Sequence, residues 1–363
     1  MPFNISIPND DVYAGLIKDA LMLTFPVPAA TTSNQKLEGV VSELVGTHHV
    51  RFGPAPNPES LVAIRSVLRR AIENNKPIAI LIPWGSKKPD NTKSIDIAEI
   101  MGLKMLYCLQ QRVSQVYAPG ISINIRIEDL SGWYIFEDEP GSVDASKKYV
   151  VDFESLITIL GLTNFIKPIR ESDLCSNVDF HTCSDIIMQK ILAYLKDSDK
   201  NGIDISLPSF QELNELGWKG VIPVEQREYY YARYTKLYHC DADTVRFKLA
   251  KYLASCLARH KLNVRCDDPE WHKDFIELTF CPPVPGAPDA LVSRRLYYRT
   301  IHDKYTRDHI PPWRGKGYLR IYDDNTVSPA VTSFVAVQDY LFNEIQISGF
   351  GENLKMIIDY VLK

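Results

Sequence analysis

Two adjacent lysines, Lys87 and Lys88, and two adjacent acids, Glu128 and Asp129, are the side chains of this sequence best placed to do chemistry. The lysines lie in a polar loop, WGSKKPDNTKS, between an apolar run and a helical pattern, and the acids follow a strand pattern at 121–127. In a parallel sheet, the loops that leave the carboxyl ends of the strands line one crevice, where ligands usually bind. We therefore expect the cations and the acids to face a common space that suits a small anionic or zwitterionic substrate.

Each of these two features has both a functional and a purely structural explanation. The lysine loop precedes a helical pattern, so backbone N–H groups and the positive end of the helix dipole would favour a phosphate or carboxylate there. The same loop is also explained as a solvated surface segment. A carboxylate at Asp129 would bind an ammonium group or act as a base, whereas Asp followed by Leu-Ser-Gly also suits a turn. Residue spacing alone does not decide between these explanations.

A second concentration of charge lies between residues 294 and 316. Arginines there would clamp an anion through paired hydrogen bonds. His302 and His309 are candidate acid–base groups because histidine titrates near neutral pH, although a loop histidine is often structural or simply exposed. The stretch also resembles a nucleic-acid patch, but the acidity of the rest of the chain argues against that reading. The cations are Arg294, Arg295, Arg299, Lys304, Arg307, Arg314 and Lys316.

The bulk composition narrows the class of protein. Of the 363 residues, 45% are apolar and 24% are charged, which supports a large folded core. The net charge of -4 gives no reason to expect nucleic-acid binding, and neither a membrane span nor a secretory signal is recognisable. Seven scattered cysteines without a CxxC predict reduced thiols in a cytoplasmic protein and no structural metal. The sequence contains no Walker loop, G-x-G-x-x-G, G-x-S-x-G or H-E-x-x-H motif.

Hydrophobic periodicity predicts the elements that would position these side chains. Asn57 as cap and Pro58 at the first position open an amphipathic helix. The apolar run at 77–83 is typical of a buried parallel strand, and a helix at 96–116 leads to an alternating strand at 121–127. These three elements predict a right-handed strand–helix–strand unit. We expect further helices at 12–23, 151–160, 180–195, 223–238, 241–262 and 354–362, strands at 275–280, 293–300, 317–322 and 328–337, and a polar loop at 31–36.

The alternation of elements predicts an α/β fold, with a mostly parallel sheet, helices on both faces and an additional strand-rich C-terminal part. We expect an N-terminal extension at 1–56 and an α/β core at 57–205. A helical segment and the C-terminal strands, at 206–363, would complete the site.

Several short motifs follow one another in a characteristic order. They are IP at 82–83, KKPDN at 87–91, SIDIAE at 94–99, YAPG at 117–120, INIRIEDL at 123–130, RRLYYRT at 294–300 and PPWR at 311–314. In this order they resemble the isocyanide (isonitrile) synthases of the pyoverdine/dityrosine-biosynthesis superfamily, over roughly two-thirds of the chain.

That resemblance implies a Rossmann-like biosynthetic enzyme that converts the amine of a free amino acid to an isocyanide, with ribulose 5-phosphate as carbon donor and no metal or redox cofactor. Lys87, Lys88 and an arginine such as Arg295 or Arg314 would hold phosphate and carboxylate, and Asp129 would meet the amine. A lysine with a lowered pKa would also be able to form an imine with the ketose. The implied catalytic residues are Lys87, Lys88, Glu128, Asp129 and His302, and the implied substrate-binding residues are Asn91, Asp96, Glu99, Arg294, Arg295, Arg299, Trp313 and Arg314.

The resemblance also implies small-molecule substrates, no nucleic acid, no membrane, and functional coupling to an iron- and oxoglutarate-dependent oxygenase; a homodimer is one option for the oligomeric state. Three positions depart from the family pattern. Glu128-Asp129-Leu130 replaces Ser-Asp-Gly, Tyr298 lies where the strand usually carries histidine, and Arg314 replaces the histidine of the tryptophan turn. A different carbon–nitrogen bond-forming or phosphate-ligand enzyme on the same scaffold therefore stays open, as does a non-catalytic anion- or RNA-binding protein.

Overall fold

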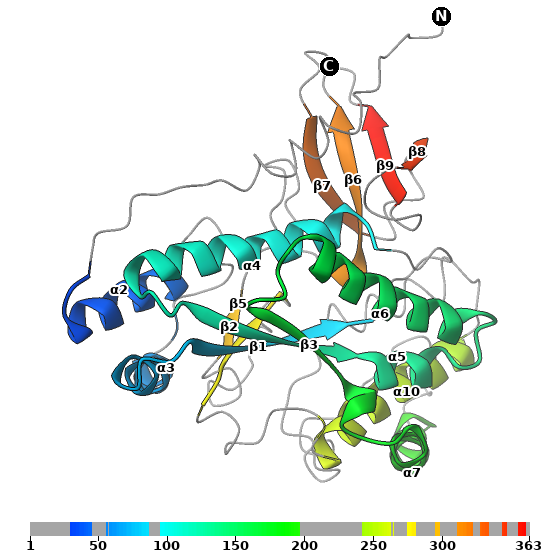
Figure 1. Ribbon diagram of the computed structural model, residues 1–363. Helices are drawn as coiled ribbons and strands as arrows, with labels where there is room; N and C mark the ends of the chain where they lie inside the picture. The colour runs from blue at the N-terminus through cyan, green and yellow to red at the C-terminus, as the bar shows by residue number, and fades with distance from the viewer. Residues whose placement is uncertain are drawn as a thin grey trace, which may run out of the picture.

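The computed structural model describes residues 30–45, 56, 58–86, 95–196, 242–262, 264, 274–280, 295–297, 311–321, 327–333, 343–346 and 355–360. Within these residues, five strands form a parallel sheet in the order β3-β2-β1-β4-β5. The five are β1 (Ile78–Gly85), β2 (Ile121–Glu128), β3 (Ile166–Arg170), β4 (Ile276–Thr279) and β5 (Arg295–Tyr297). Figure 1 shows this sheet with helices on both faces, which confirms the predicted α/β class.

The predicted strand–helix–strand unit is present and lies at the centre of the sheet. β1 pairs with β2 in parallel from Ile78 opposite Ile121 to Gly85 opposite Glu128. α4 (Ile97–Val116) connects the two strands. Both strands are buried along most of their length because helices cover both faces, which explains the near-continuous apolar sequence of β1.

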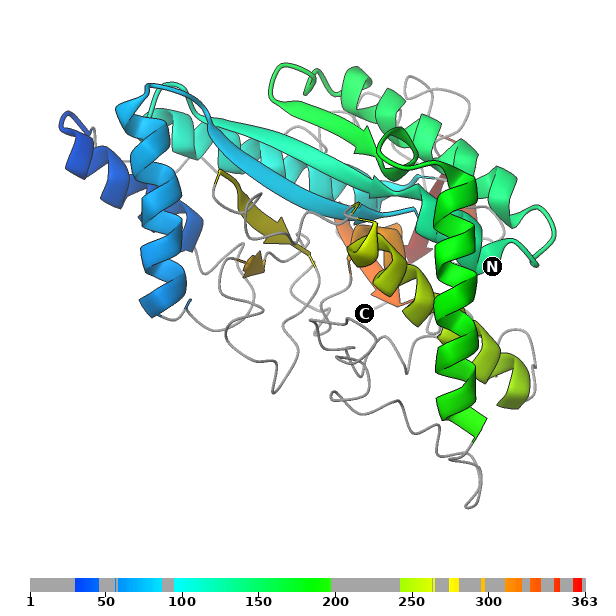
Figure 2. The ribbon, with the colours of Figure 1, turned by 90° about the horizontal axis from the view of Figure 1, so that it is seen from below.

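The helices divide into two layers. α4 and α6 (Ser142–Ile159) run along one face of the sheet, while α7 (Asn177–Lys196) and α10 (Ala242–Lys261) lie on the other (Figure 1). Figure 2 shows α3 (Pro58–Glu73) near the ends at which β1 and β2 start, and α7 with α10 near the ends at which they stop. The carboxyl edge of the sheet is therefore the edge that α10 approaches.

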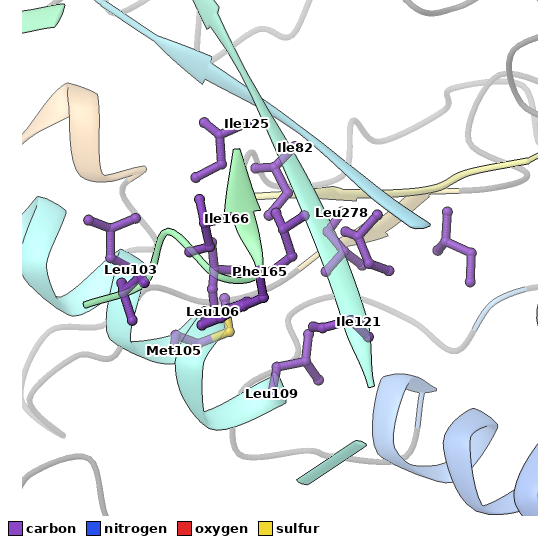
Figure 3. Close-up of a cluster of buried hydrophobic side chains, with 14 of the residues drawn as sticks. Ile82, Leu103, Met105, Leu106, Leu109, Ile121, Ile125, Phe165, Ile166 and Leu278 are labelled. Atoms are coloured by element: carbon purple, nitrogen blue, oxygen red, sulfur yellow. The ribbon is translucent and has the colours of Figure 1, made fainter. Parts of the chain in front are cut away.

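The main core lies between the sheet and α4. Figure 3 shows Leu103, Met105, Leu106 and Leu109 of α4 beside strand side chains such as Ile125, all of them buried. A second apolar cluster joins α5 (Asp129–Phe136) to α7 and α10. α10 meets the ends of β2 and β3 at the carboxyl edge of the sheet.

The polar segment at 31–36 was wrongly predicted as a loop, because α2 (Ser33–Val45) begins inside it. Thr32 and Gln35 form a capping box: the Gln35 amide donates to the Thr32 hydroxyl over 3.2 Å, and the Thr32 amide donates to Gln35 Oε1 over 3.0 Å. Leu37 and Leu44 of this helix belong to the main core, so part of the expected N-terminal extension packs on the sheet domain.

Two elements near the site were not predicted. α5 starts at Asp129, where only a turn was considered, and it is buried on nearly all sides, so its sequence lacks the polar face that marks a surface helix. β3 contains Pro168, which is compatible with its place at the edge of the sheet. α6 begins at Ser142 instead of the expected residue 151, whereas α7 and α10 match their predicted ranges closely.

The C-terminal part forms a second sheet in the order β7-β6-β9-β8. Its strands are β6 (Gly315–Ile321), β7 (Val327–Ser333), β8 (Asn343–Gln346) and β9 (Lys355–Tyr360). The helix predicted at 354–362 is wrong, because β9 pairs in parallel with β6 and antiparallel with β8. A short apolar run that contains the β-branched pair Ile357 and Ile358 does not separate helix from strand by periodicity alone.

The helices predicted at 12–23 and 223–238 lie outside the described residues. In the part of the chain that the structure describes, no helix is both long and apolar enough to cross a membrane.

Candidate active site

The ends of three neighbouring strands meet at the carboxyl edge of the first sheet. Gly85 at the end of β1 lies opposite Glu128 of β2, and Ile127 lies opposite Arg170 at the end of β3. The Ser86 hydroxyl donates to the Glu128 carbonyl over 2.9 Å and so joins the ends of β1 and β2. This edge is where a parallel α/β sheet presents its ligand site.

Asp129 is completely buried at the start of α5. Its carboxylate accepts hydrogen bonds from the Leu130 amide (3.0 Å), the Ser172 amide (3.1 Å) and the Ser172 hydroxyl (2.6 Å). Burial raises the pKa of Asp129, although these donors favour the ionised form and oppose the shift. The carboxylate also lies at the positive end of the α5 dipole. Asp129 therefore has one fixed orientation, set by Leu130 and by Ser172 of the short 3₁₀ helix that follows β3.

Glu128, the other predicted acid, is paired with a residue from a distant part of the sequence. Arg259 of α10 donates from Nη2 to Glu128 Oε1, and its Nε lies 2.8 Å from Oε1 of Glu171. Glu171 belongs to the short 3₁₀ helix η1 (Glu171–Asp173) that follows β3. The Glu128 side chain keeps 17% of its surface exposed, whereas that of Glu171 is fully buried. One guanidinium thus links the ends of β2 and β3 to α10.

A second arginine lies in the same buried region. Arg126 of β2 is 3% exposed and donates from Nη1 to the Val264 carbonyl over 3.3 Å. Its Nε has no hydrogen-bond partner among the described residues. We call the five side chains the acidic–arginine cluster: Arg126, Glu128, Asp129, Glu171 and Arg259.

The same face of α10 also holds the far end of α5. Lys248 donates to Asp138, and Lys251 donates to Glu137 over 2.6 Å. Both lysines are almost fully buried. α10 therefore clamps α5 at both ends, with Arg259 at the amino end and the lysines at the carboxyl end.

Sequence reasoning missed Arg259 and Glu171. A signal for the first was present: Lys248, Lys251, Ser255 and Arg259 recur at three- and four-residue spacing, so they form one stripe on α10. All four are buried. No comparable pattern marks Glu171, because η1 is too short to show periodicity and β3 was itself unrecognised.

The other half of the edge, at the ends of β1 and β4, is aromatic. Trp84 stacks on Phe153 with ring centroids 4.5 Å apart, and its ring also meets Trp313 at 5.1 Å and Phe280 at 5.6 Å. Trp313, predicted to bind substrate, is 4% exposed and packs on Gly85, where a Cβ would overlap the indole ring. The structure therefore places Trp313 in the packing that supports the end of β1.

Asp96 and Glu99 also have local structural roles. Asp96 is the N-cap of α4 and accepts from the Ala98 amide over 2.8 Å, while Glu99 Oε2 accepts from the Asp96 amide over 2.8 Å. The remaining oxygen of Glu99 accepts from the Tyr149 hydroxyl over 3.0 Å. Tyr149 in turn accepts from Trp84 Nε1 over 3.1 Å. A buried hydrogen-bond chain thus connects the capping box to the aromatic half of the edge.

Several predicted site residues lie outside the described residues. They are Lys87, Lys88, Asn91, Arg294, Arg299 and His302. For Arg295 in β5 and Arg314 in the 3₁₀ helix η5 (Pro312–Arg314), only the backbone is described. Whether these cations face Glu128 and Asp129 therefore stays a prediction. Within the described part of the chain, no group of three or more His, Cys, Asp and Glu side chains has the arrangement of a metal site.

No family model matches the chain, and no curated protein matches it in sequence. Among solved structures, the chain is similar to the crystal structure of the PvcA protein from Pseudomonas aeruginosa, with a TM-score of 0.56 and 17% sequence identity. The match covers 89% of this chain and 99% of that one. At this level of identity the similarity shows a shared fold that extends over most of both chains.

Proposed function

We propose that this protein is a biosynthetic enzyme of the PvcA type that resembles the isocyanide synthases. It would convert the amine of a free amino acid to an isocyanide, with ribulose 5-phosphate as carbon donor. The observation that carries the proposal is the position of Glu128 and Asp129: the motif that resembles the Ser-Asp-Gly of the family ends β2 at the carboxyl edge of a parallel sheet. The fold shared with PvcA supports it.

The geometry refines the roles that we propose for the two acids. Asp129 has no exposed surface, and hydrogen bonds already fix its orientation. Glu128 keeps part of its side chain exposed, so a substrate amine would reach Glu128 first. We assign contact with the ammonium group to Glu128 and the stable negative charge behind it to Asp129. Lys87 and Lys88, on the loop that leaves β1, would supply the positive charge for phosphate and carboxylate.

The departures from the family pattern favour one second candidate. Arg314 replaces a histidine in the tryptophan turn, and Glu128 replaces the serine before Asp129. Arginine is not a general base at neutral pH. An enzyme that binds the same amino acid and phosphosugar but lacks these proton-transferring side chains would form another carbon–nitrogen bond instead of an isocyanide.

The test is a mass-resolved incubation of the purified protein with ribulose 5-phosphate and a pool of the common amino acids. The proposal predicts a product heavier by one carbon and lighter by two hydrogens than one of the amino acids. The Lys88→Ala variant should lose turnover, and Lys76→Ala, which removes a lysine from the opposite end of β1, is the matched control. A product with any other change in mass would support the second candidate. Unchanged turnover in both Lys88→Ala and Asp129→Ala would contradict both assignments.

A further inference from the structure

The acidic–arginine cluster has more acids than bases. It holds three carboxyl groups and two guanidinium groups, and every member except Glu128 is at least nine-tenths buried. A surplus charge in a protein interior is costly, and a buried acid commonly relieves it by keeping its proton. The cluster is therefore balanced when one of its three acids is neutral.

The hydrogen bonds distinguish the three acids. Asp129 accepts three, which stabilise a carboxylate. Glu128 accepts a charged hydrogen bond from Arg259 and retains contact with solvent. Glu171 receives no hydrogen bond at either oxygen from the described residues, and its contact with Arg259 is an ion pair alone.

We propose that Glu171 is the proton-holding member of the cluster and acts as a positioning residue, which leaves Arg259 to Glu128 and the negative charge to Asp129. The proposal deepens the proposed function and rests on it for its effect on turnover. Among the described residues, the charged and titratable groups that face Glu171 are Arg126 and Glu128 of β2, Asp129 of α5, Arg259 of α10 and Cys175 of the segment between η1 and α7. Burial raises the pKa of Glu171 to about 7, against the opposing effect of Arg259.

The consequence for the proposed reaction follows from competition for Arg259. While Glu171 is neutral, the guanidinium is paired chiefly with Glu128 and holds it at the end of β2. When Glu171 ionises, it draws Arg259 away and places a third negative charge beside Asp129. We therefore expect kcat to fall as the pH rises through about 7, with little change in KM because Glu171 does not contact substrate.

The test that does not depend on activity is the pH dependence of stability. An acid whose pKa is raised by folding binds more protons in the folded state, so its contribution to stability is complete at low pH. That contribution is lost as the pH rises from about 4.5 to about 7. Glu171→Gln imitates the protonated form and has no such loss. Between about pH 4.5 and about pH 7, the ratio of folded to unfolded Glu171→Gln should therefore rise roughly 100-fold relative to the same ratio for wild type.

Urea unfolding of both proteins across the window measures this difference. Glu154→Gln, which removes a carboxylate paired with Arg170 outside the cluster, is the matched control and should keep the wild-type pH dependence. An identical pH dependence in wild type and Glu171→Gln would overturn the proposal. If Glu171→Gln does not fold, infrared spectroscopy of the wild type decides. A buried protonated carboxyl band that disappears near pH 7 supports the proposal, and its absence at about pH 6 overturns it.

Activity then tests the second half of the proposal. The fall of kcat above about pH 7 should be absent in Glu171→Gln, while Glu171→Ala should lose activity at every pH because it also removes the side chain that packs on Arg259. A purely structural role for Glu171 would lower kcat in both variants without changing the pH profile. If wild type forms no isocyanide, the proposed function fails, but the stability measurement still decides the state of Glu171.

Discussion

The two halves of the carboxyl edge are filled by different kinds of side chain, aromatic rings in one half and paired charges in the other. At the ends of β1 and β4, Trp84, Phe280 and Trp313 fill the space with rings. At the ends of β2 and β3, Glu128 and Glu171 share Arg259. An aromatic packing is stable by itself, whereas buried charges are retained only when they compensate one another. The aromatic half therefore supports the ends of its strands by packing alone, and we propose that the charged half sets the electrostatics of the site.

The largest expected effect comes from removing the centre of the aromatic half. Trp84→Ala should lower the free energy of unfolding by about 4 kcal/mol, because a fully buried indole that touches three rings leaves a cavity. Urea denaturation measures the loss. Trp84→Phe keeps a ring but lacks the donor to Tyr149, so it should cost clearly less; equal losses for the two variants would contradict the packing role.

Breaking the charged half should cost about 3 kcal/mol. Arg259→Gln removes the guanidinium that pairs with both Glu128 and Glu171 in a buried region. Adding Glu171→Gln to this variant removes the cost of protonating a buried acid that has lost its arginine, so above about pH 7 the double variant should be more stable than Arg259→Gln alone. A double-mutant cycle by urea unfolding measures the coupling, and strict additivity would show that the two residues do not interact.

A glycine tests how closely Trp313 packs on the end of β1 within the aromatic half. Gly85→Ala should destabilise the fold by about 2 kcal/mol, because the new methyl group overlaps the Trp313 ring. Thermal unfolding measures the cost. Gly161→Ala is not a suitable control because that glycine has a positive φ, so Ala79→Gly in the same strand serves as the comparison for β1. Tolerance of Gly85→Ala without loss would contradict the packing of Trp313 on β1.

The smallest effect concerns the hydrogen bonds to Asp129. Ser172→Ala should cost about 1 kcal/mol, since it removes one of three donors to a buried carboxylate. It should also raise the pKa of Asp129 further, because that donor favours the ionised form. Stability should then fall more steeply than in wild type as the pH rises above the ordinary pKa of an aspartate, which pH-dependent urea unfolding measures. If wild type and Ser172→Ala show the same pH dependence of stability, Ser172 does not influence the ionisation of Asp129.

The sequence predicted the elements whose signals are local. α4 carries its own cap in Asp96 and Glu99, and the alternation of Ile121 to Ile127 is visible in the chain. The position of Asp129 at the sheet edge followed from those two elements. The structure gives Asp96 and Glu99 a capping role that the sequence pattern also predicts, and the substrate contact that the family motif implies for them stays a prediction.

The sequence does not show which side chains and strands pair with one another over long sequence separations. Arg259 meets Glu128 across 131 positions of sequence, and no local pattern encodes that pairing. β3 was missed because Pro168 interrupts a short apolar run, and with it Glu171 was missed. The helix predicted at 354–362 is a strand because its pairing with β6 and β8 depends on other strands, which local periodicity does not reveal.

Carbon transfer from carbon-13-labelled ribulose 5-phosphate, to the amino acid identified in the pooled incubation, tests the proposed reaction and the roles of the two halves of the edge together. Turnover should be compared between wild type, Asp129→Asn and Trp84→Phe, with circular dichroism to confirm that each protein is folded. We predict labelled product with wild type, a loss of about 100-fold or more with Asp129→Asn because the fixed negative charge behind Glu128 is lost, and a much smaller loss with Trp84→Phe. Equal losses in the two variants, or full activity in Asp129→Asn, would contradict the division of the edge into a supporting and a reactive half.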